Sequence, residues 1–268
     1  MLENEILTSR NNPLVKEFRA LAQAKTRKNT GLFLVEGIHH VGAAVEADWY
    51  LKTILYAPDL LTSDYARDLV QVAAKKGVRC QSASADILRS LAGKENPQGI
   101  LASVRQRETT LAGLKSFKSG AAVLAPQDAG NVGTILRTLD AAGADALILL
   151  DGGVDIYHPK VVRASMGALF WKPVVRTSFD EFLTWTEKKN LLRIGTSARG
   201  TSDLSSLRLS DKGWVLLLGS EQKGLTQAQV DACDYLVSLP MRGRGTSLNL
   251  GVAAGIFLYG LMQKTPRR

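Results

Sequence analysis

One loop in the second half of the chain combines glycines with an amide and a guanidinium, groups that can bind and orient a polar ligand. This segment, QDAGNVGTILRT (127–138), places Asn131 where a helix would begin and Arg137 further along that helix. Glycine lets the backbone approach a ligand closely. The segment has neither the GK[ST] of a phosphate-binding P-loop nor the GxGxxG of a dinucleotide site. It therefore predicts a polar ligand site and disfavours a nucleotide-dependent oxidoreductase.

Two further loops carry polar residues directly after apolar runs. In LLLGSEQKGLT (216–226), the carboxylate of Glu221 could bind a hydroxyl, pair with a base or only cap the next helix. In LPMRGRGTSLNLGVAAG (239–255), Ser247 and Asn249 precede a long apolar stretch, and Ser247 could equally be a helix N-cap. Each loop alone is a weak signal, since glycine-rich turns with polar caps are common.

The elements around these loops alternate between apolar runs of strand length and stretches of helix length. This alternation favours a parallel sheet that is buried on both faces. Ligands bind such sheets at the carboxyl ends of the strands, so we expect the three loops to meet at one edge. The expected strands are 121–126, 144–152, 172–177, 191–198, 213–220 and 235–241, and the expected helices are 131–143, 159–170, 178–190 (capped by Ser178), 225–234 and 247–264.

The N-terminal part has the pattern of a smaller α/β unit. Its expected strands are 31–37, 51–58, 78–84 and 99–106, and its expected helices are 12–28, 39–47, 64–77 and 85–93. A polar stretch without an apolar run of strand length follows it, which is typical of a domain linker. We therefore expect an N-terminal domain at 1–106, a linker at 107–120 and a second domain at 121–268.

The charge of the chain makes an anionic partner plausible. Its 34 Lys and Arg residues exceed its 25 Asp and Glu residues and leave a net charge of +9. Such a balance is typical of proteins that bind nucleic acid. The segment 10–28 is especially basic, although a single basic cluster can also be just a solvated helix face. The residues of this segment that we expect to contact such a partner are Lys16, Arg19, Lys25, Arg27 and Lys28.

Several classes of protein do not fit the sequence. No apolar stretch has the length of a membrane span, and the N-terminus lacks the pattern of a signal peptide. Two cysteines, Cys80 and Cys233, cannot form a disulfide framework or a four-cysteine metal site, and we expect both to be buried thiols. His39 and His40 are expected to be surface or packing residues on a helix. The sequence therefore predicts a cytoplasmic protein without a metal site.

Taken together and in this order, the three loops resemble the motifs of the SpoU-type (TrmH-like) branch of the trefoil-knotted SPOUT RNA ribose methyltransferases. The segments that carry the resemblance are NVGTILRT (131–138), LLLGSEQKGL (216–225), LPMRGRGTSLNLGVAAGI (239–256) and the central PKVVRASMGALFWKPVV (159–175). NPLVKEFRALAQAKTRKNTGLFLVEG (12–37) and NPQGILASV (96–104) are similar to the substrate-binding domain of two-domain members, among them ribosomal-RNA and thiostrepton-resistance methyltransferases.

The resemblance implies an α/β fold of two parts: a C-terminal trefoil-knotted, parallel-sheet methyltransferase domain and a smaller, ribosomal-protein-like N-terminal domain that binds RNA. It implies transfer of a methyl group from S-adenosyl-L-methionine to a ribose 2′-hydroxyl, without a metal, by a homodimer acting on structured RNA. The residues that match the family's catalytic positions are Asn131, Arg137, Glu221, Ser247 and Asn249. Those that match its cofactor-binding positions are Thr196, Gly219, Ser220, Gly224, Leu239, Met241 and Leu248.

The guanidinium of Arg137 stays protonated at neutral pH. Proposals for the family make this arginine the base. We instead expect Arg137 to hold the phosphate beside the target ribose through two hydrogen bonds. Arg163 and Ser165 of the central segment are further candidates for phosphate contact.

Two departures from the family pattern and three alternatives stay open. Ala129 stands where members usually carry proline, and Gly251 stands where they carry a second serine, which puts one active-site hydrogen bond in doubt. Ribosomal RNA is the favoured substrate because relatives with a separate N-terminal domain often act there. Transfer RNA is the first alternative, a relative that binds RNA without catalysis is the second, and the oxidoreductase is the third.

Overall fold

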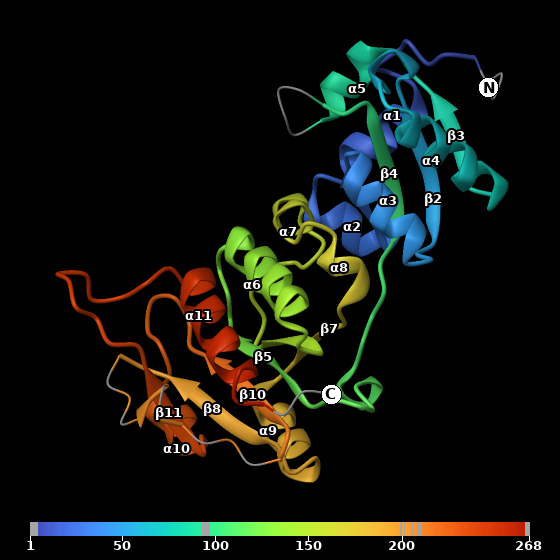
Figure 1. The fold of residues 1–268 in the computed structure, drawn as a ribbon. Coiled ribbons are helices and arrows are strands. Elements are labelled where there is room, and N and C mark those ends of the chain that lie inside the picture. The colour runs from blue at the N-terminus through green and yellow to red at the C-terminus, as the bar shows by residue number, and fades with distance from the viewer. Residues whose placement is uncertain are drawn as a thin grey trace. The chain divides into compact units, whose positions relative to one another are not determined.

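The computed structural model describes residues 5–92, 97–198, 200, 202–204, 206–207, 209 and 211–265 (Figure 1). The chain divides into two compact units. The first consists of Met1–Arg107 and Tyr157–Phe170, and the second consists of Glu108–Ile156 and Trp171–Arg268. The expected boundaries placed all of residues 121–268 in one domain, whereas Tyr157–Phe170 packs with the first unit.

The first unit is built on a four-stranded sheet in the order β1-β4-β2-β3. β4 pairs antiparallel with β1 and β2, while β2 and β3 are parallel. The α1 and α5 helices cover one face through Val15, Phe18, Ile87 and Leu88. The elements of this unit are α1 (Pro13–Ala20), α2 (Ala24–Thr30), β1 (Leu32–Glu36), α3 (Ile38–Glu46), β2 (Leu51–Tyr56), α4 (Asp64–Lys75), β3 (Arg79–Ser82), α5 (Ala85–Leu91), β4 (Ile100–Arg105), α7 (Pro159–Ala164) and most of α8 (Ala168–Trp171), with a 3-10 turn at Pro58–Leu60.

The expected helix over 12–28 is wrong, because the structure has two helices there. The break follows from Arg27, which is only 1% exposed. Its guanidinium donates hydrogen bonds to the carbonyl oxygens of Leu21 (2.9 Å) and Ala22 (2.8 Å). Leu21 is the C-cap of α1 and Ala22 follows it, so these hydrogen bonds supply donors to carbonyls at the end of the helix. Arg27 is therefore a structural residue, and its expected contact with RNA is also wrong.

The expected helix over 159–170 is also interrupted, by a turn in which Met166 has φ 48° and Gly167 has φ 90°. Two histidines of α3 contact this segment. The Nε2 atoms of His39 and His40 lie 3.1 Å from the carbonyl oxygen of Met166 and 3.3 Å from that of Arg163, respectively. The two histidines are thus packing residues, as expected, and they hold the end of α7.

The second unit is built on a seven-stranded parallel sheet in the order β7-β6-β5-β10-β8-β11-β9. The sequence did not predict β9, which has only two residues. The elements are β5 (Ser119–Leu124), α6 (Ala129–Ala142), β6 (Ala146–Leu150), β7 (Val174–Thr177), α9 (Phe179–Lys188), β8 (Leu192–Thr196), β9 (Ser202–Asp203), β10 (Trp214–Leu218), α10 (Gln227–Asp231), β11 (Tyr235–Ser238) and α11 (Leu250–Met262), with a 3-10 turn at Leu111–Gly113.

The central strands of this sheet are buried on both faces, as the sequence predicts. Alternate residues of a strand point to opposite faces. On one face, Ala122, Ile148 and Leu217 share a core with Phe182 and Trp185 of α9. The intervening strand residues are also buried, and α6 and α11 lie side by side over that second face (Figure 1).

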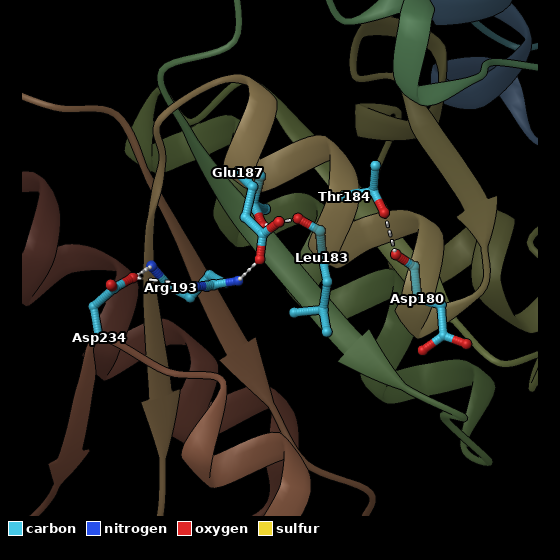
Figure 2. Close-up of polar contacts among 7 residues, drawn as sticks. Asp180, Leu183, Thr184, Glu187, Arg193 and Asp234 are labelled. Atoms are coloured by element: carbon cyan, nitrogen blue, oxygen red, sulfur yellow. Dashed lines mark hydrogen bonds and ion pairs between the residues drawn. The ribbon is translucent and has the colours of Figure 1, made fainter.

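Arg193 of β8 connects three elements of the second unit (Figure 2). Its side chain lies 3.4 Å from the carboxylate of Glu187 in α9 and 3.7 Å from that of Asp234, which precedes β11. Its backbone N–H also donates to Asp234 at 2.7 Å. These contacts fix β8 beside β11 and thereby position Thr196, the last residue of β8.

Neither Cys80 nor Cys233 is part of a disulfide. Cys80 is buried and Cys233 is half-buried, and burial raises the pKa of each thiol to about 11. None of the helices in the described part of the chain is long and apolar enough to cross a membrane.

Candidate active site at the carboxyl edge of the parallel sheet

A cavity of about 980 Å³ lies where β10, β8 and β11 end. These three strands are neighbours in the sheet, so the loops that follow them meet, as the rule for parallel sheets predicts. The loop after β5 adds Asp128 and Asn131 to the wall. The site residues expected from the sequence that line this cavity are Asn131, Thr196, Gly219, Ser220, Glu221, Gly224, Leu239, Met241, Ser247, Leu248 and Asn249.

A chain of hydrogen bonds joins the three loops at the mouth of the cavity. Asn249 is the N-cap of α11, and its Oδ1 accepts hydrogen bonds from the backbone N–H groups of Gly251 (2.9 Å) and Val252 (3.3 Å). Its Nδ2 therefore faces outward and donates to Oδ1 of Asn131 at 2.9 Å. The Nδ2 of Asn131 in turn donates to a carboxylate oxygen of Glu221. The cap of α11 thus fixes how both amides and the carboxylate are oriented.

Glu221 is held by a tight turn after β10. The backbone N–H of Ser220 donates to the Gly224 carbonyl (3.2 Å), and that of Gly224 donates to the Ser220 carbonyl (2.9 Å). A Cβ atom on Gly219 would lie 2.3 Å from the carbonyl carbon of Gly224. Gly219 is therefore required for this close approach of two backbone segments, independently of any ligand.

Arg137 is the one expected catalytic residue that does not line the cavity. It lies on the exposed side of α6, beside Thr134 and Thr138. Those two threonines face α11, because a Cβ on Gly251 would lie 3.1 Å from Thr134 Cγ2 and one on Gly255 would lie 3.7 Å from Thr138 Cγ2. Arg137 thus projects beside the α6–α11 contact.

Both departures from the family pattern have a local structural explanation. Asp128 is the N-cap of α6, which makes Ala129 the first helical residue. Proline is favoured at that position but is not required. Gly251 sits where α11 approaches α6 most closely, so a serine there would require Thr134 to shift by a few tenths of an ångström.

The remaining basic residues have different environments. Those that are exposed, as RNA contact requires, are Lys16, Arg19, Lys25 and Lys28. Arg163 is partly exposed and forms an ion pair with Glu36 at 3.4 Å. Ser165 is fully buried, and its hydroxyl donates to the Val162 carbonyl at 2.8 Å, so the expected phosphate contact of Ser165 is wrong.

Sequence reasoning missed several residues of the cavity. Lys223 contributes a cation to its wall, and Ala253 and Phe257 contribute an apolar face of α11. The spacing of four between Ala253 and Phe257, which puts both on one helix face, was the available signal. No group of three or more His, Cys, Asp or Glu side chains in the described ranges is placed to hold a metal ion.

Two family models match the chain. The SpoU rRNA Methylase family matches residues 121–259, which span every loop of the cavity. The MRM3-like substrate binding domain matches residues 12–102.

Two relatives and one solved structure align with nearly the whole chain. A 23S rRNA (uridine(2479)-2'-O)-methyltransferase of Streptomyces viridochromogenes is 34% identical over 94% of this chain and 90% of its own length. The 23S rRNA (guanosine(2553)-2'-O)-methyltransferase RlmP of Bacillus subtilis is 31% identical over 95% of this chain and 98% of its own. The crystal structure of an AdoMet-bound rRNA methyltransferase from Sinorhizobium meliloti superposes with a TM-score of 0.88, at 31% identity and 97% coverage of both chains. The chain therefore belongs to the SpoU rRNA methylase family.

Proposed function

We propose that the protein transfers a methyl group from S-adenosyl-L-methionine to a ribose 2′-hydroxyl in 23S ribosomal RNA. The observation that carries this proposal is the joining of all three motif loops by the Asn249–Asn131–Glu221 hydrogen bonds at one cavity. The two relatives are named as 2′-O-methyltransferases of 23S rRNA, one acting at a uridine and one at a guanosine. We therefore assign the shared loops to binding of the ribose and not to selection of the base.

The cavity fits the proposed cofactor. Its volume of about 980 Å³ is within the range of small-molecule sites, which combine an apolar wall with a few placed polar groups. Leu218, Leu225 and Phe257 supply an apolar wall for an adenine ring, and backbone groups next to Thr196, Gly219, Leu239, Met241 and Leu248 supply polar contacts. When bound, the cofactor supplies an electrophilic methyl group.

The chain's own residues then have to hold the ribose hydroxyl in line with that methyl group. The Glu221 carboxylate accepts hydrogen bonds from Asn131 and, at 3.3 Å, from the backbone N–H of Gln127. A carboxylate has about four acceptor positions, so Glu221 can also accept a hydrogen bond from the ribose 2′-hydroxyl. We assign orientation of the site to Asn131, Ser247 and Asn249. Arg137 is assigned to the phosphate beside the target ribose.

We infer that Arg137 reaches a site through dimerisation. Apolar side chains at 252, 256 and 259 form a stripe on α11 in which Val252 is 51%, Ile256 44% and Tyr259 48% exposed. Their spacing puts all three on one face, and such a stripe is typical of a protein interface. Because Arg137 lies beside the α6–α11 contact, a second copy packed on this stripe would bring it toward the partner's RNA.

The same proposal assigns the remaining parts of the molecule. The parallel-sheet unit is the methyltransferase domain, and we infer from the match of residues 121–259 to the SpoU family that it contains the family's trefoil knot. The N-terminal unit binds structured RNA through Lys16, Arg19, Lys25 and Lys28, with Arg163 as a further contact. We place the protein in the cytoplasm, where ribosomal RNA would be available to it.

The test is methyl transfer from radiolabelled S-adenosyl-L-methionine to transcribed 23S rRNA and to a bulk tRNA pool. Ribose methylation is then mapped by resistance of the modified linkage to alkaline cleavage. We expect one modified ribose in the ribosomal RNA. Modification of tRNA alone would favour the first alternative. Cofactor binding without transfer to either RNA would favour the non-catalytic alternative.

A further inference from the structure

An exposed tyrosine of the first unit has features of a base-stacking site. Tyr50 immediately precedes β2 and is 55% exposed. The guanidinium carbon of Arg105, the last residue of β4, lies 4.2 Å from the centre of its ring. The backbone N–H of Arg105 also donates to the Tyr50 carbonyl at 2.9 Å. The ring is therefore held in place by its neighbour while more than half of its surface stays open.

The adjacent tryptophan provides an internal comparison. Trp49 also carries a guanidinium over its ring, that of Arg107 at 4.5 Å. Trp49, however, is only 9% exposed, its indole N–H donates to the Phe170 carbonyl at 3.0 Å, and its ring packs against Phe33. Packing accounts for Trp49. It does not account for an aromatic residue at position 50, whose ring lies outside this cluster.

The surroundings of Tyr50 favour a polyanion. Lys52 follows two residues later, at an irregularity in the pairing of β2 with β4, and is exposed like Tyr50. It pairs with Glu17 of α1 at 2.7 Å, which brings Tyr50 close to the helix that carries Lys16 and Arg19. Arg105 pairs in register with Leu32, directly after α2. The ring thus lies next to the two helices whose exposed cations are assigned to RNA phosphates.

We propose that the free face of Tyr50, backed by Arg105, stacks with an unpaired base of the RNA substrate. Sequence-specific proteins recognise RNA largely through unpaired bases that stack on aromatic rings or guanidinium planes. The α1 and α2 cations would attract the backbone, and this platform would select a segment with a splayed-out base. This inference rests on the proposed function, since it concerns how the RNA substrate of that reaction is bound.

The test compares Tyr50→Leu with Tyr50→Phe in filter binding to transcribed 23S rRNA and to a fully paired RNA duplex. Loss of one stacked base should weaken rRNA affinity by roughly 5- to 150-fold in Tyr50→Leu and leave Tyr50→Phe near the wild type. Duplex affinity should not change, because its bases are not available for stacking. The dependence of rRNA affinity on salt should also keep its slope, because no phosphate contact is lost.

Tyr65→Leu is the matched control, because Tyr65 is 52% exposed on α4 of the same unit and carries no such platform. Equal rRNA affinity of Tyr50→Leu and the wild type would overturn the inference, as would an equal loss in Tyr65→Leu. A changed oligomeric state of Tyr50→Leu would overturn it too. Failure of the wild type to bind or methylate any RNA would instead refute the proposed function.

Discussion

Replacing Asn249 with aspartate separates two roles that this side chain has in the structure. Its Oδ1 caps α11 by accepting from Gly251 and Val252, and its Nδ2 donates to Asn131 at 2.9 Å. A carboxylate caps a helix as well as an amide does, and it interacts favourably with the helix dipole. It cannot, however, donate a hydrogen bond. Asn249→Asp therefore keeps the cap and removes only the link to the active site.

Asn131 cannot compensate for this loss. If its amide rotates to donate to the new carboxylate, its oxygen turns toward Glu221 and the Asn131–Glu221 hydrogen bond is lost instead. The unrotated orientation loses the bond between the two amides and places a carboxylate against the Asn131 carbonyl oxygen, whereas the rotated orientation loses the bond to the charged Glu221, which is worth about 1.5–3 kcal/mol. If the transition state depends on this arrangement, kcat/KM should fall roughly 10- to 150-fold. Asn249→Ala loses the cap as well, at a further cost of about 1 kcal/mol.

The assay is methyl transfer to 23S rRNA combined with thermal unfolding followed by circular dichroism. Asn249→Asp should unfold close to the wild-type temperature, whereas Asn249→Ala should unfold about 2–4 °C lower. Asn190→Asp, in an exposed turn of the same unit, adds the same charge and should leave activity unchanged. If Asn249→Asp transfers methyl groups at the wild-type rate, Asn249 is only a helix cap and the proposed hydrogen-bond chain has no catalytic role.

Other substitutions test individual parts of this account. Arg27→Ala should destabilise the first unit by about 2–4 kcal/mol, because it leaves the Leu21 and Ala22 carbonyls unsatisfied. Lys28→Ala should leave the melting temperature unchanged and reduce the salt slope of RNA binding by about one. Ala129→Pro should stabilise the protein by about 0.4–1 kcal/mol, since Asp128 already has the extended conformation (φ −94°, ψ 117°) that a following proline requires. Ala141→Pro, inside α6, should instead cost about 3 kcal/mol. Equal melting temperatures of these two variants would contradict this assignment of the helix start. Gly219→Val should lower both the melting temperature and, in calorimetry, affinity for S-adenosyl-L-methionine, because the Gly224 backbone must move. Arg137→Lys should abolish methyl transfer and retain cofactor binding, since lysine lacks the planar fork; near-normal turnover would refute the phosphate role.

The sequence by itself predicted most of the loop residues that line the cavity and the elements that hold them. Each motif loop lies between an apolar strand and a helix, and every expected strand is present within a few residues of its expected bounds. Local rules also held at Ser178, which forms a capping box with Glu181. These features depend on neighbouring residues alone, through periodicity, turn glycines and caps, so they can be read without the fold.

Contacts between distant residues decided the rest. The break between α1 and α2 depends on a guanidinium that folds back onto the preceding helix, and nothing in the local sequence distinguishes buried Arg27 from exposed Lys28. The segment Tyr157–Phe170 joins the first unit through contacts such as that between Trp49 and Phe170. The periodicity of one segment contains no information about such partners.

The active site itself depends on the spatial order of the strands. β10 lies between β5 and β8, although it follows both in the sequence. That order places the Glu221 turn directly beside the loop of Asn131, and packing of α11 against α6 brings Asn249 to the same point. The sequence supplied the three polar loops, but only the tertiary structure could bring them together, because hydrogen bonds between side chains 90 or more residues apart form only once the sheet has set its strand order.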